Sequence, residues 1–306
     1  MLRLARLYYV EGVSQNQLAE REGISKATVS RMLSLARENG FVTVTVNDGL
    51  RDANVLANQL RDIYPDVQFT VVPTSHNDRT EILDKVALAT AHYLDNLVKN
   101  GDIIGFGGSE ILNMIAKYLT PKDVRDVVAL SLTGIIVNPN CESIAYQTGV
   151  KLANAYQTDA NFLPLPIIFD DIAAKELVEK EGLIRHLEKL GRLANIALIS
   201  LDSIEDSSFL NQMNYFKDEQ KRKITEKAVG DILGHFINNN GEIIDPTLDE
   251  RVVTTPLNNL KHKEYSIATV HKVETVPTLK AALKAGYCNK VFIDQYSTQV
   301  LLDSYV

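Results

Sequence analysis

The feature that most constrains the fold of this chain is an alternation of short, continuously apolar segments with amphipathic helical stretches. The helical patterns lie at 52–63, 78–99, 109–119, 142–157, 172–191, 215–227, 277–286 and 296–303. The strand patterns lie at 67–73, 102–107, 126–134, 161–166, 195–202, 265–270 and 290–294. Continuously apolar strands need helices on both faces, which is the arrangement of a mostly parallel sheet. We therefore predict a doubly wound, mostly parallel α/β domain.

The length and the composition of the chain fit two domains. The 306 residues are 45% hydrophobic and 23% charged, which is enough apolar material for a substantial core. The segment NDGLRD at 47–52 has the composition of a linker. We therefore predict a small domain over residues 1–50 and a larger domain over residues 51–306.

The sequence also predicts the environment of the protein. No apolar run approaches the roughly 18 residues needed to cross a bilayer, and the start of the chain lacks the features of a secretory signal. The two cysteines, Cys141 and Cys288, are too few for a disulfide framework and do not have metal-binding spacing. These features predict a cytoplasmic protein with no membrane partner.

The N-terminal segment has the pattern of a helix-turn-helix. Residues 2–10 have helical spacing that Gly12 ends, and Ser14 with Gln17 has the signature of a capping box. A further helical pattern covers 26–38. The alternating segment FVTVTVN that follows is predicted to be a strand that forms a wing.

Three residues occupy the positions that a helix-turn-helix requires. Ala19 lets the helices approach, Gly23 supplies a left-handed turn, and Val29 anchors the second helix to the core. Short polar and cationic groups nearby can contact phosphates or base edges, which makes the DNA-contact candidates Gln15, Gln17, Ser25, Lys26, Thr28, Ser30 and Arg31. An ordinary helical hairpin with a solvated polar face is the alternative interpretation.

The charge distribution favours DNA binding by this segment. Residues 1–47 hold six basic and four acidic residues, a net charge of +2, whereas the whole chain carries −7. The other residues therefore carry a net charge of −9. This difference predicts a phosphate-binding surface at the N-terminus.

A glycine turn follows the strand pattern at 102–107. Glu110 stands where the third glycine of a dinucleotide fingerprint would be, and no P-loop lysine follows. The turn is either a packing feature or an anion site at a helix N-terminus, and its place after a strand makes it the default ligand site of an open α/β sheet.

The sequence gives little support for catalysis. The six histidines are scattered, and neither H-E-x-x-H nor G-x-S-x-G occurs. We therefore predict no enzyme, no metal and no cofactor.

Several segments together resemble the SorC family of sugar-responsive transcriptional regulators. They are LARLYYVEGVSQNQLAEREGISKATVSRML near the start, GDIIGFG, NFLPLPIIFD, ANIALISL, KAVGDILGHFINNNGEI and LKAALKAGYCNKVFIDQYSTQVLL. Within the family, L-P-L-P at 163–166 and Tyr215-Phe216 are most similar to the branch of deoxyribonucleoside regulators. The resemblance implies a winged helix-turn-helix, an effector domain similar to phosphosugar isomerases, and assembly as a tetramer.

The resemblance also implies a site for a phosphorylated sugar. Its positions fall on Gly107, Gly108, Ser109, Glu110, Thr133, Gly134, Asp231, Lys272 and Thr275. Asp231 matches the family and would bind sugar hydroxyls. Thr133 stands where deoxyribonucleoside regulators carry an imine-forming lysine, and a hydroxyl cannot form an imine. Glu110 would repel a phosphate.

These departures leave two alternatives for the pocket. Either it binds an unphosphorylated or differently placed ligand, with Lys272 and His271 as substitute cations, or it no longer binds an effector. A shift of the alignment around 271–275 would return Lys272 to the family's lysine role. We favour an altered ligand.

The function predicted from the sequence is a repressor or activator of a sugar or deoxyribonucleoside catabolic operon. It would bind a palindromic double-stranded operator as a homo-oligomer, a dimer or tetramer, and respond to a small sugar or sugar phosphate. The alternatives are a sugar-phosphate isomerase with an accessory DNA-binding head, since fold alone does not fix function, and a ligand-independent DNA-binding protein.

Overall fold

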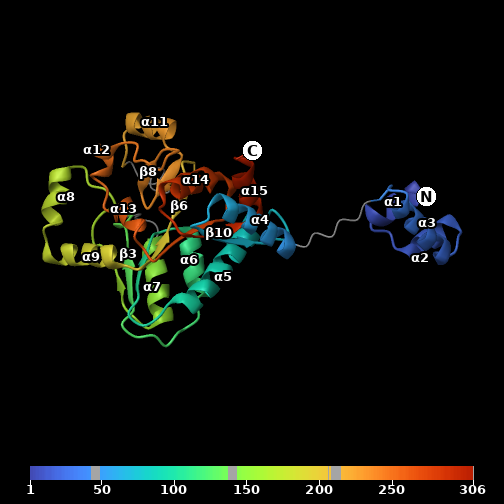
Figure 1. Cartoon of the computed structure of the whole chain (residues 1–306), viewed down its shortest axis with the longest axis horizontal. Helices are drawn as coiled ribbons and strands as arrows, with labels where there is room; N and C mark the ends of the chain where they lie inside the picture. Colours follow the sequence, from blue (N-terminus) through green and yellow to red (C-terminus); the bar gives the residue numbers. More distant parts are fainter. Residues whose placement is uncertain (43–48, 137–142, 206, 208–214, 306) are drawn as a thin grey trace. The chain divides into compact units, whose positions relative to one another are not determined.

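The computed structural model describes residues 1–42, 49–136, 143–205, 207 and 215–305 (Figure 1). The chain divides into two compact units, Met1–Asp48 and Gly49–Val306. Most of the predicted wing strand at 41–47 lies outside the described residues, as does Cys141.

The first unit contains three helices: α1 (Leu2–Tyr9), α2 (Gln15–Glu22) and α3 (Lys26–Glu38). The capping box predicted from Ser14 and Gln17 begins α2, and Gly23 adopts the left-handed conformation at φ 65°. The helices share a small apolar core that contains Leu4, Ala5, Leu18, Val29, Leu33 and Ala36. The predicted helices and the turn between them are therefore confirmed.

The second unit is built on a seven-stranded parallel sheet. Its strands are β1 (Gln68–Val72), β2 (Ile103–Phe106), β3 (Val128–Ser131), β4 (Ala160–Asn161), β5 (Ile196–Ile199), β9 (Tyr265–Val270) and β10 (Lys290–Asp294). They lie in the order β1-β10-β9-β5-β2-β3-β4, with every pair parallel. This is the doubly wound sheet predicted from the sequence.

Helices cover both faces of the sheet. One face packs against α5 (Arg79–Leu97), α6 (Glu110–Tyr118) and α7 (Ile144–Tyr156). The other packs against α4 (Gly49–Ile63), α13 (Leu257–Leu260), α14 (Val276–Ala285) and α15 (Gln295–Asp303). Two further helices, α8 (Ile172–Val178) and α9 (Gly182–Leu193), lie beyond β3 (Figure 1).

The order of the strands reverses between β2 and β5. From β2 the chain continues outward to β3 and β4, then returns to place β5 on the other side of β2. A reversal of this kind leaves a crevice outside the carboxyl ends of the two strands, and ligands of open α/β sheets bind there. The glycine turn after β2 therefore begins at the switch point.

Several predicted boundaries are wrong. The single strand predicted at 195–202 is two strands: β5 ends at Ile199, and residues Leu201–Ser203 pair in a different, antiparallel sheet. The strand predicted at 161–166 ends at Asn161, because prolines 164 and 166 have no amide hydrogen to donate to a ladder. The helix predicted at 172–191 is broken before Gly182, a residue with weak helix preference. The predicted linker at 47–52 extends too far, because α4 already begins at Gly49.

A small antiparallel sheet that the sequence analysis did not predict follows β5. It consists of β6 (Leu201–Ser203), β7 (Gly230–Ile232) and β8 (His235–Ile237). Two short helices, α11 (Asp218–Lys227) and α12 (Pro246–Asp249), precede and follow its last two strands. Among the helices of the described residues, none has the length and apolar character of a membrane span.

Candidate functional site

The first two turns of α3 present several of the predicted DNA-contact residues. Lys26, Ser30 and Arg31 are exposed, whereas Val29 on the same helix is fully buried. The side chain of Ser25 caps the helix by accepting a hydrogen bond from the Thr28 amide at 3.1 Å. The helix thus turns its apolar side to the core and its cationic side to solvent.

Of the other DNA-contact candidates in the first unit, Gln17, Ser25 and Thr28 make hydrogen bonds at the starts of α2 and α3. Gln17 Oε1 accepts a hydrogen bond from the Ser14 amide at 3.1 Å, and Thr28 Oγ1 lies 2.9 Å from Ser25 Oγ. Gln15, the first residue of α2, is half-buried. Capping occupies Gln17, Ser25 and Thr28 in part, so Lys26, Ser30 and Arg31 are the strongest candidates for direct DNA contact.

The glycine turn after β2 is tightly packed. A Cβ atom on Gly107 would lie 2.6 Å from Leu233 Cδ2, and one on Gly108 would lie 2.9 Å from Ala145 Cβ. Ser109 then caps α6, and the exposed Glu110 is the first residue of that helix. Neighbouring segments therefore approach Gly107 and Gly108 too closely for a side chain, which is one reason why both positions hold glycine.

Thr133 and Gly134 form a second predicted segment. Thr133 is buried and makes an antiparallel bridge to Thr254. The amide of Gly134 donates to the carbonyl of Val253 at 2.8 Å, and a Cβ atom there would lie 2.7 Å from the Pro166 carbonyl oxygen. The Gly134 amide is thus already bonded within the chain, so this residue shapes the segment rather than offering an amide to an anion.

Asp231 lies in the middle of β7 and is only 3% exposed. Its carboxylate accepts hydrogen bonds from Ser207 Oγ at 2.6 Å and from the Gly234 amide at 3.1 Å. Burial raises the pKa of Asp231 to about 6, although these two hydrogen bonds and the charge of His235 oppose the rise. Asp202 on β6 is directly opposite.

Lys272 and Thr275 follow β9. Lys272 is half-buried and precedes the 3₁₀ turn η1 (Val273–Thr275), whose last residue, Thr275, is buried at the start of α14. The turn packs against β6, and α14 packs against β7. The segment at 271–275 is therefore a neighbour of the small sheet that carries Asp231.

Leu233 connects the predicted segments. It occupies the tip of the β7–β8 hairpin with a left-handed φ of 53°, and its side chain lies against Gly107. Its carbonyl oxygen accepts a hydrogen bond from Thr254 Oγ1 at 2.9 Å, and Thr254 is the residue that bridges to Thr133. The glycine turn, the Thr133 segment and Asp231 thus meet around one hairpin.

The sequence analysis did not single out Leu233 or Thr254. Leu233 escaped notice because leucine is not a residue typical of turns. Thr254 escaped notice because it lies in an irregular segment and belongs to no motif. Within the described residues, no group of three or more histidine, cysteine, aspartate or glutamate side chains is placed to hold a metal ion.

Comparison with known proteins shows the class to which the chain belongs. Residues 48–303 match the family model described as "Putative sugar-binding domain". The deoxyribonucleoside regulator of Bacillus subtilis (strain 168) is 33% identical over 302 residues, which cover 99% of this chain and 96% of that protein. The sorbitol operon regulator of Klebsiella pneumoniae is 22% identical over 309 residues, covering 99% and 97%. The class is that of transcriptional regulators with a sugar-binding domain.

The fold agrees with this class. The crystal structure of the full-length sorbitol operon regulator SorC from Klebsiella pneumoniae has a TM-score of 0.74 at 21% identity, covering 98% of this chain and 97% of that chain. The chain belongs to the SorC-type family of sugar-binding transcriptional regulators. The resemblance found in the sequence is therefore confirmed.

Proposed function

We propose that this chain is a DNA-binding regulator of a sugar or deoxyribonucleoside catabolic operon, and that a small sugar or sugar phosphate controls it. The first unit would bind the operator through α3, because Lys26, Ser30 and Arg31 are exposed on that helix. The second unit would bind the effector near the switch point. The relatives named as regulators favour a non-enzymatic role.

The observation that carries the effector site is the burial of Asp231. A buried carboxylate whose ionisation is disfavoured lowers the stability of the folded chain, and such groups concentrate at functional sites. Its place beside the glycine turn, through Leu233, is where a ligand of a doubly wound sheet would bind. Sugar hydroxyls would donate hydrogen bonds to this carboxylate.

A thermal-shift screen on the full chain tests the effector class. Suitable probes are deoxyribose 5-phosphate, deoxyribose, glucitol and glucitol 6-phosphate. A gel-shift assay with each probe then uses a duplex that the protein has selected from a random pool. We expect one probe to raise the melting temperature and to alter the mobility shift. Binding of DNA that no sugar alters would contradict effector control and favour the ligand-independent alternative.

Whether the proposed site accepts a phosphorylated sugar depends on the charge of Glu110. We expect Glu110→Thr to raise the affinity for deoxyribose 5-phosphate about threefold, because a like charge is removed next to the glycine turn but is partly screened at an exposed position. Titration calorimetry measures the change. Glu181→Thr, an exposed glutamate at the start of α9, is the matched control and should change nothing. Equal affinities of parent and Glu110→Thr would show that Lys272 or a neighbour compensates for the carboxylate.

We further propose that the chain acts as a homo-oligomer, a dimer or tetramer, on a palindromic operator in the cytoplasm. The first unit has a core of few side chains and a correspondingly small surface for self-association, so the second unit should provide the oligomer contacts. We expect light scattering on a fragment of residues 49–306 to report a dimer or tetramer. A monomeric fragment would contradict this assignment.

A further inference from the structure

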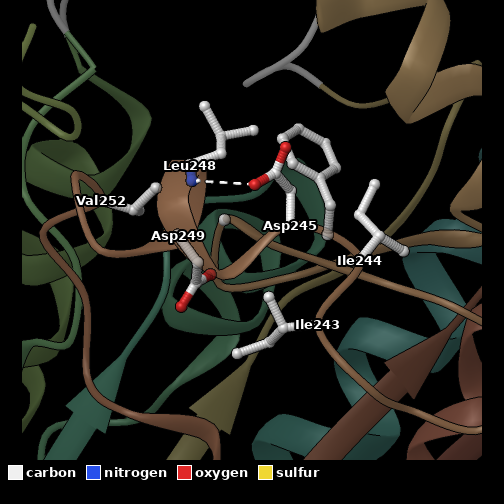
Figure 2. A pocket seen from close by; sticks show the side chains of 8 residues that line it. Ile243, Ile244, Asp245, Leu248, Asp249 and Val252 are labelled. Atoms are coloured by element: carbon white, nitrogen blue, oxygen red, sulfur yellow. Dashed lines mark hydrogen bonds between the residues drawn. The ribbon is translucent and has the colours of Figure 1, made fainter.

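Two hollows of the second unit differ widely in size. Figure 2 shows the pocket beside α12, where the carboxyl group of Asp245 accepts a hydrogen bond from the Leu248 amide at 3.2 Å. Its volume of about 10 Å³ leaves room for one water molecule at most. A groove along α14 and α15 has a volume of about 670 Å³. Of the two, only the groove can receive side chains of another molecule.

The groove has a mostly apolar and aromatic lining. Its apolar and aromatic side chains are Tyr64, Val273, Val276, Pro277, Val300 and Tyr305. The hydroxyl groups of the two tyrosines are hydrogen-bonded to each other, and their rings meet edge to face with centres 6.0 Å apart. This contact holds the end of the chain against the segment that follows α4, so the groove has a defined wall.

Exposed apolar side chains continue from the groove along α4. Val55, Ile63, Val273, Val300 and Tyr305 are each 38–52% exposed. The helix α4 packs against α15, and Ile63 directly precedes the groove residue Tyr64. We call the surface that contains these five exposed residues the α4–α15 face. Large apolar side chains that share one exposed surface mark an interaction site.

Carboxylates flank the apolar residues of α4. At about 100° per residue, Asp52, Val55, Asp62 and Ile63 project from one side of this helix, whereas Arg61 projects about 120° away from Val55. Both aspartates are exposed. The part of the α4–α15 face that α4 provides is therefore acidic at its margin.

The wall of the groove that α14 provides is basic. Lys280 and Lys284 are one turn apart on α14, and both line the groove. Lys280 Nζ lies 4.1 Å from the centre of the Tyr305 ring, and Lys284 Nζ donates to Asn240 Oδ1 at 2.6 Å, so both ammonium groups stay at the groove. A two-fold axis along the groove places the lysines of each copy over the carboxylates of the other. The face is therefore complementary to a second copy of itself.

The place of α4 in the chain supports the same partner. The helix begins at Gly49, directly after the first unit ends at Asp48. Contact between the α4 helices of two copies brings together the chain segments that lead to two DNA-binding units, as a palindromic operator requires. The 15 residues of α4 span about 22 Å, so with α14 and α15 the face is comparable to the roughly 800 Å² that each partner buries in a stable interface.

We propose that two copies of this chain associate through the α4–α15 face, with the lysines of α14 in each copy over the aspartates of α4 in the other. The inference rests on the proposed homo-oligomer and names its contact surface. The apolar side chains form the centre of the contact, and two equivalent sets of ion pairs form its rim.

Sedimentation velocity of the full chain tests the apolar centre. The double variant Val55→Glu, Val300→Glu places unpaired carboxylates in the contact, so we expect the mass of the assembly to fall by half and its dissociation constant to rise at least about 100-fold. The matched control is Leu88→Glu with Leu177→Glu, which makes the same kind of change at exposed positions on α5 and α8. The control should keep the native mass.

A charge-swap experiment tests the rim. Lys280→Glu with Lys284→Glu makes the face acidic, and Asp52→Lys with Asp62→Lys makes it basic, so each variant should self-associate at least about tenfold more weakly than the parent. An equimolar mixture of the two variants should form a mixed assembly of near-native affinity, because unlike charges then meet at every rim contact. Misfolded chains cannot produce this recovery.

The outcomes separate this inference from the proposed homo-oligomer. A monomeric parent would contradict both. A parent assembly whose mass is unchanged in Val55→Glu, Val300→Glu would overturn the inference alone and assign the groove to a different partner. Native self-association of both charge variants, or charge variants that stay apart when mixed, would overturn it as well. If circular dichroism shows that the glutamate variant does not fold, the mixture decides.

Discussion

Replacing Lys26 and Arg31 together with alanine should lower operator affinity about 100-fold, because each cation contributes on the order of 1 kcal/mol or more to phosphate or base contacts. Both side chains are exposed on α3, while Val29, Leu33 and Ala36 fix the opposite side of that helix in the core. The double variant should therefore fold normally and lose only DNA binding. The measurement is a fluorescence-anisotropy titration on a selected duplex at several salt concentrations.

The salt dependence distinguishes this loss from misfolding. If the two residues contact phosphates, the slope of log affinity against log salt should become shallower by about 2 in the double variant. Arg222→Ala with Lys227→Ala removes the same charge from exposed positions on α11 and should leave binding unchanged. Native affinity in the Lys26/Arg31 double variant would disprove the assignment of α3 as the recognition helix.

Asp231→Asn should remove most effector binding and at the same time stabilise the protein at neutral pH. The amide cannot provide the negative charge that attracts sugar hydroxyls, so we expect affinity for the bound sugar to fall about 30-fold or more. The substitution also removes a buried charge. We expect this to raise the free energy of unfolding at pH 7 by on the order of 2 kcal/mol. Loss of function with a gain in stability is typical of a binding residue.

The sign of the pH effect follows from the raised pKa of Asp231. Between about pH 4 and pH 6 the folded state binds more protons than the unfolded state, so the stability of the parent falls as pH rises through this range. The advantage of Asp231→Asn should therefore be present at pH 7 and absent below pH 4, as measured by thermal melts in buffers across that range.

Asp245→Asn provides a control of opposite sign. The ion pair with Lys223 lowers the pKa of Asp245, so its charge stabilises the folded state at neutral pH. The asparagine variant should therefore be less stable than the parent at pH 7, and the difference should shrink in acid. A stabilised Asp245→Asn, or an Asp231→Asn that is destabilised at pH 7, would contradict this account of the two carboxylates.

The sheet could be predicted from the sequence because its strands are continuously apolar. The pattern at 265–270 and that at 290–294 match β9 and β10 residue for residue. The small sheet could not be predicted, because β7 and β8 have three residues each and their turn contains a leucine with positive φ. Packing against Gly107, which is distant in the sequence, stabilises this conformation of Leu233, and no local sequence pattern indicates it.

The candidate site was predicted in part. The resemblance named Asp231, and the structure places it beside the glycine turn through Leu233. The sequence did not reveal that the Gly134 amide is bonded to the Val253 carbonyl, because that contact joins segments more than a hundred residues apart.

The contact of Leu233 with Gly107 has a consequence for redesign of the ligand specificity. The space that a side chain at position 107 would need is already filled by Leu233 at the hairpin tip and by Ser200, whose Oγ would lie 2.9 Å from a Cβ atom there. The three positions therefore share one volume, and a larger side chain at position 107 demands smaller ones at positions 200 and 233. Libraries that randomise the glycine turn alone should yield mostly misfolded proteins, whereas libraries that vary positions 107, 200 and 233 together can reach new ligands.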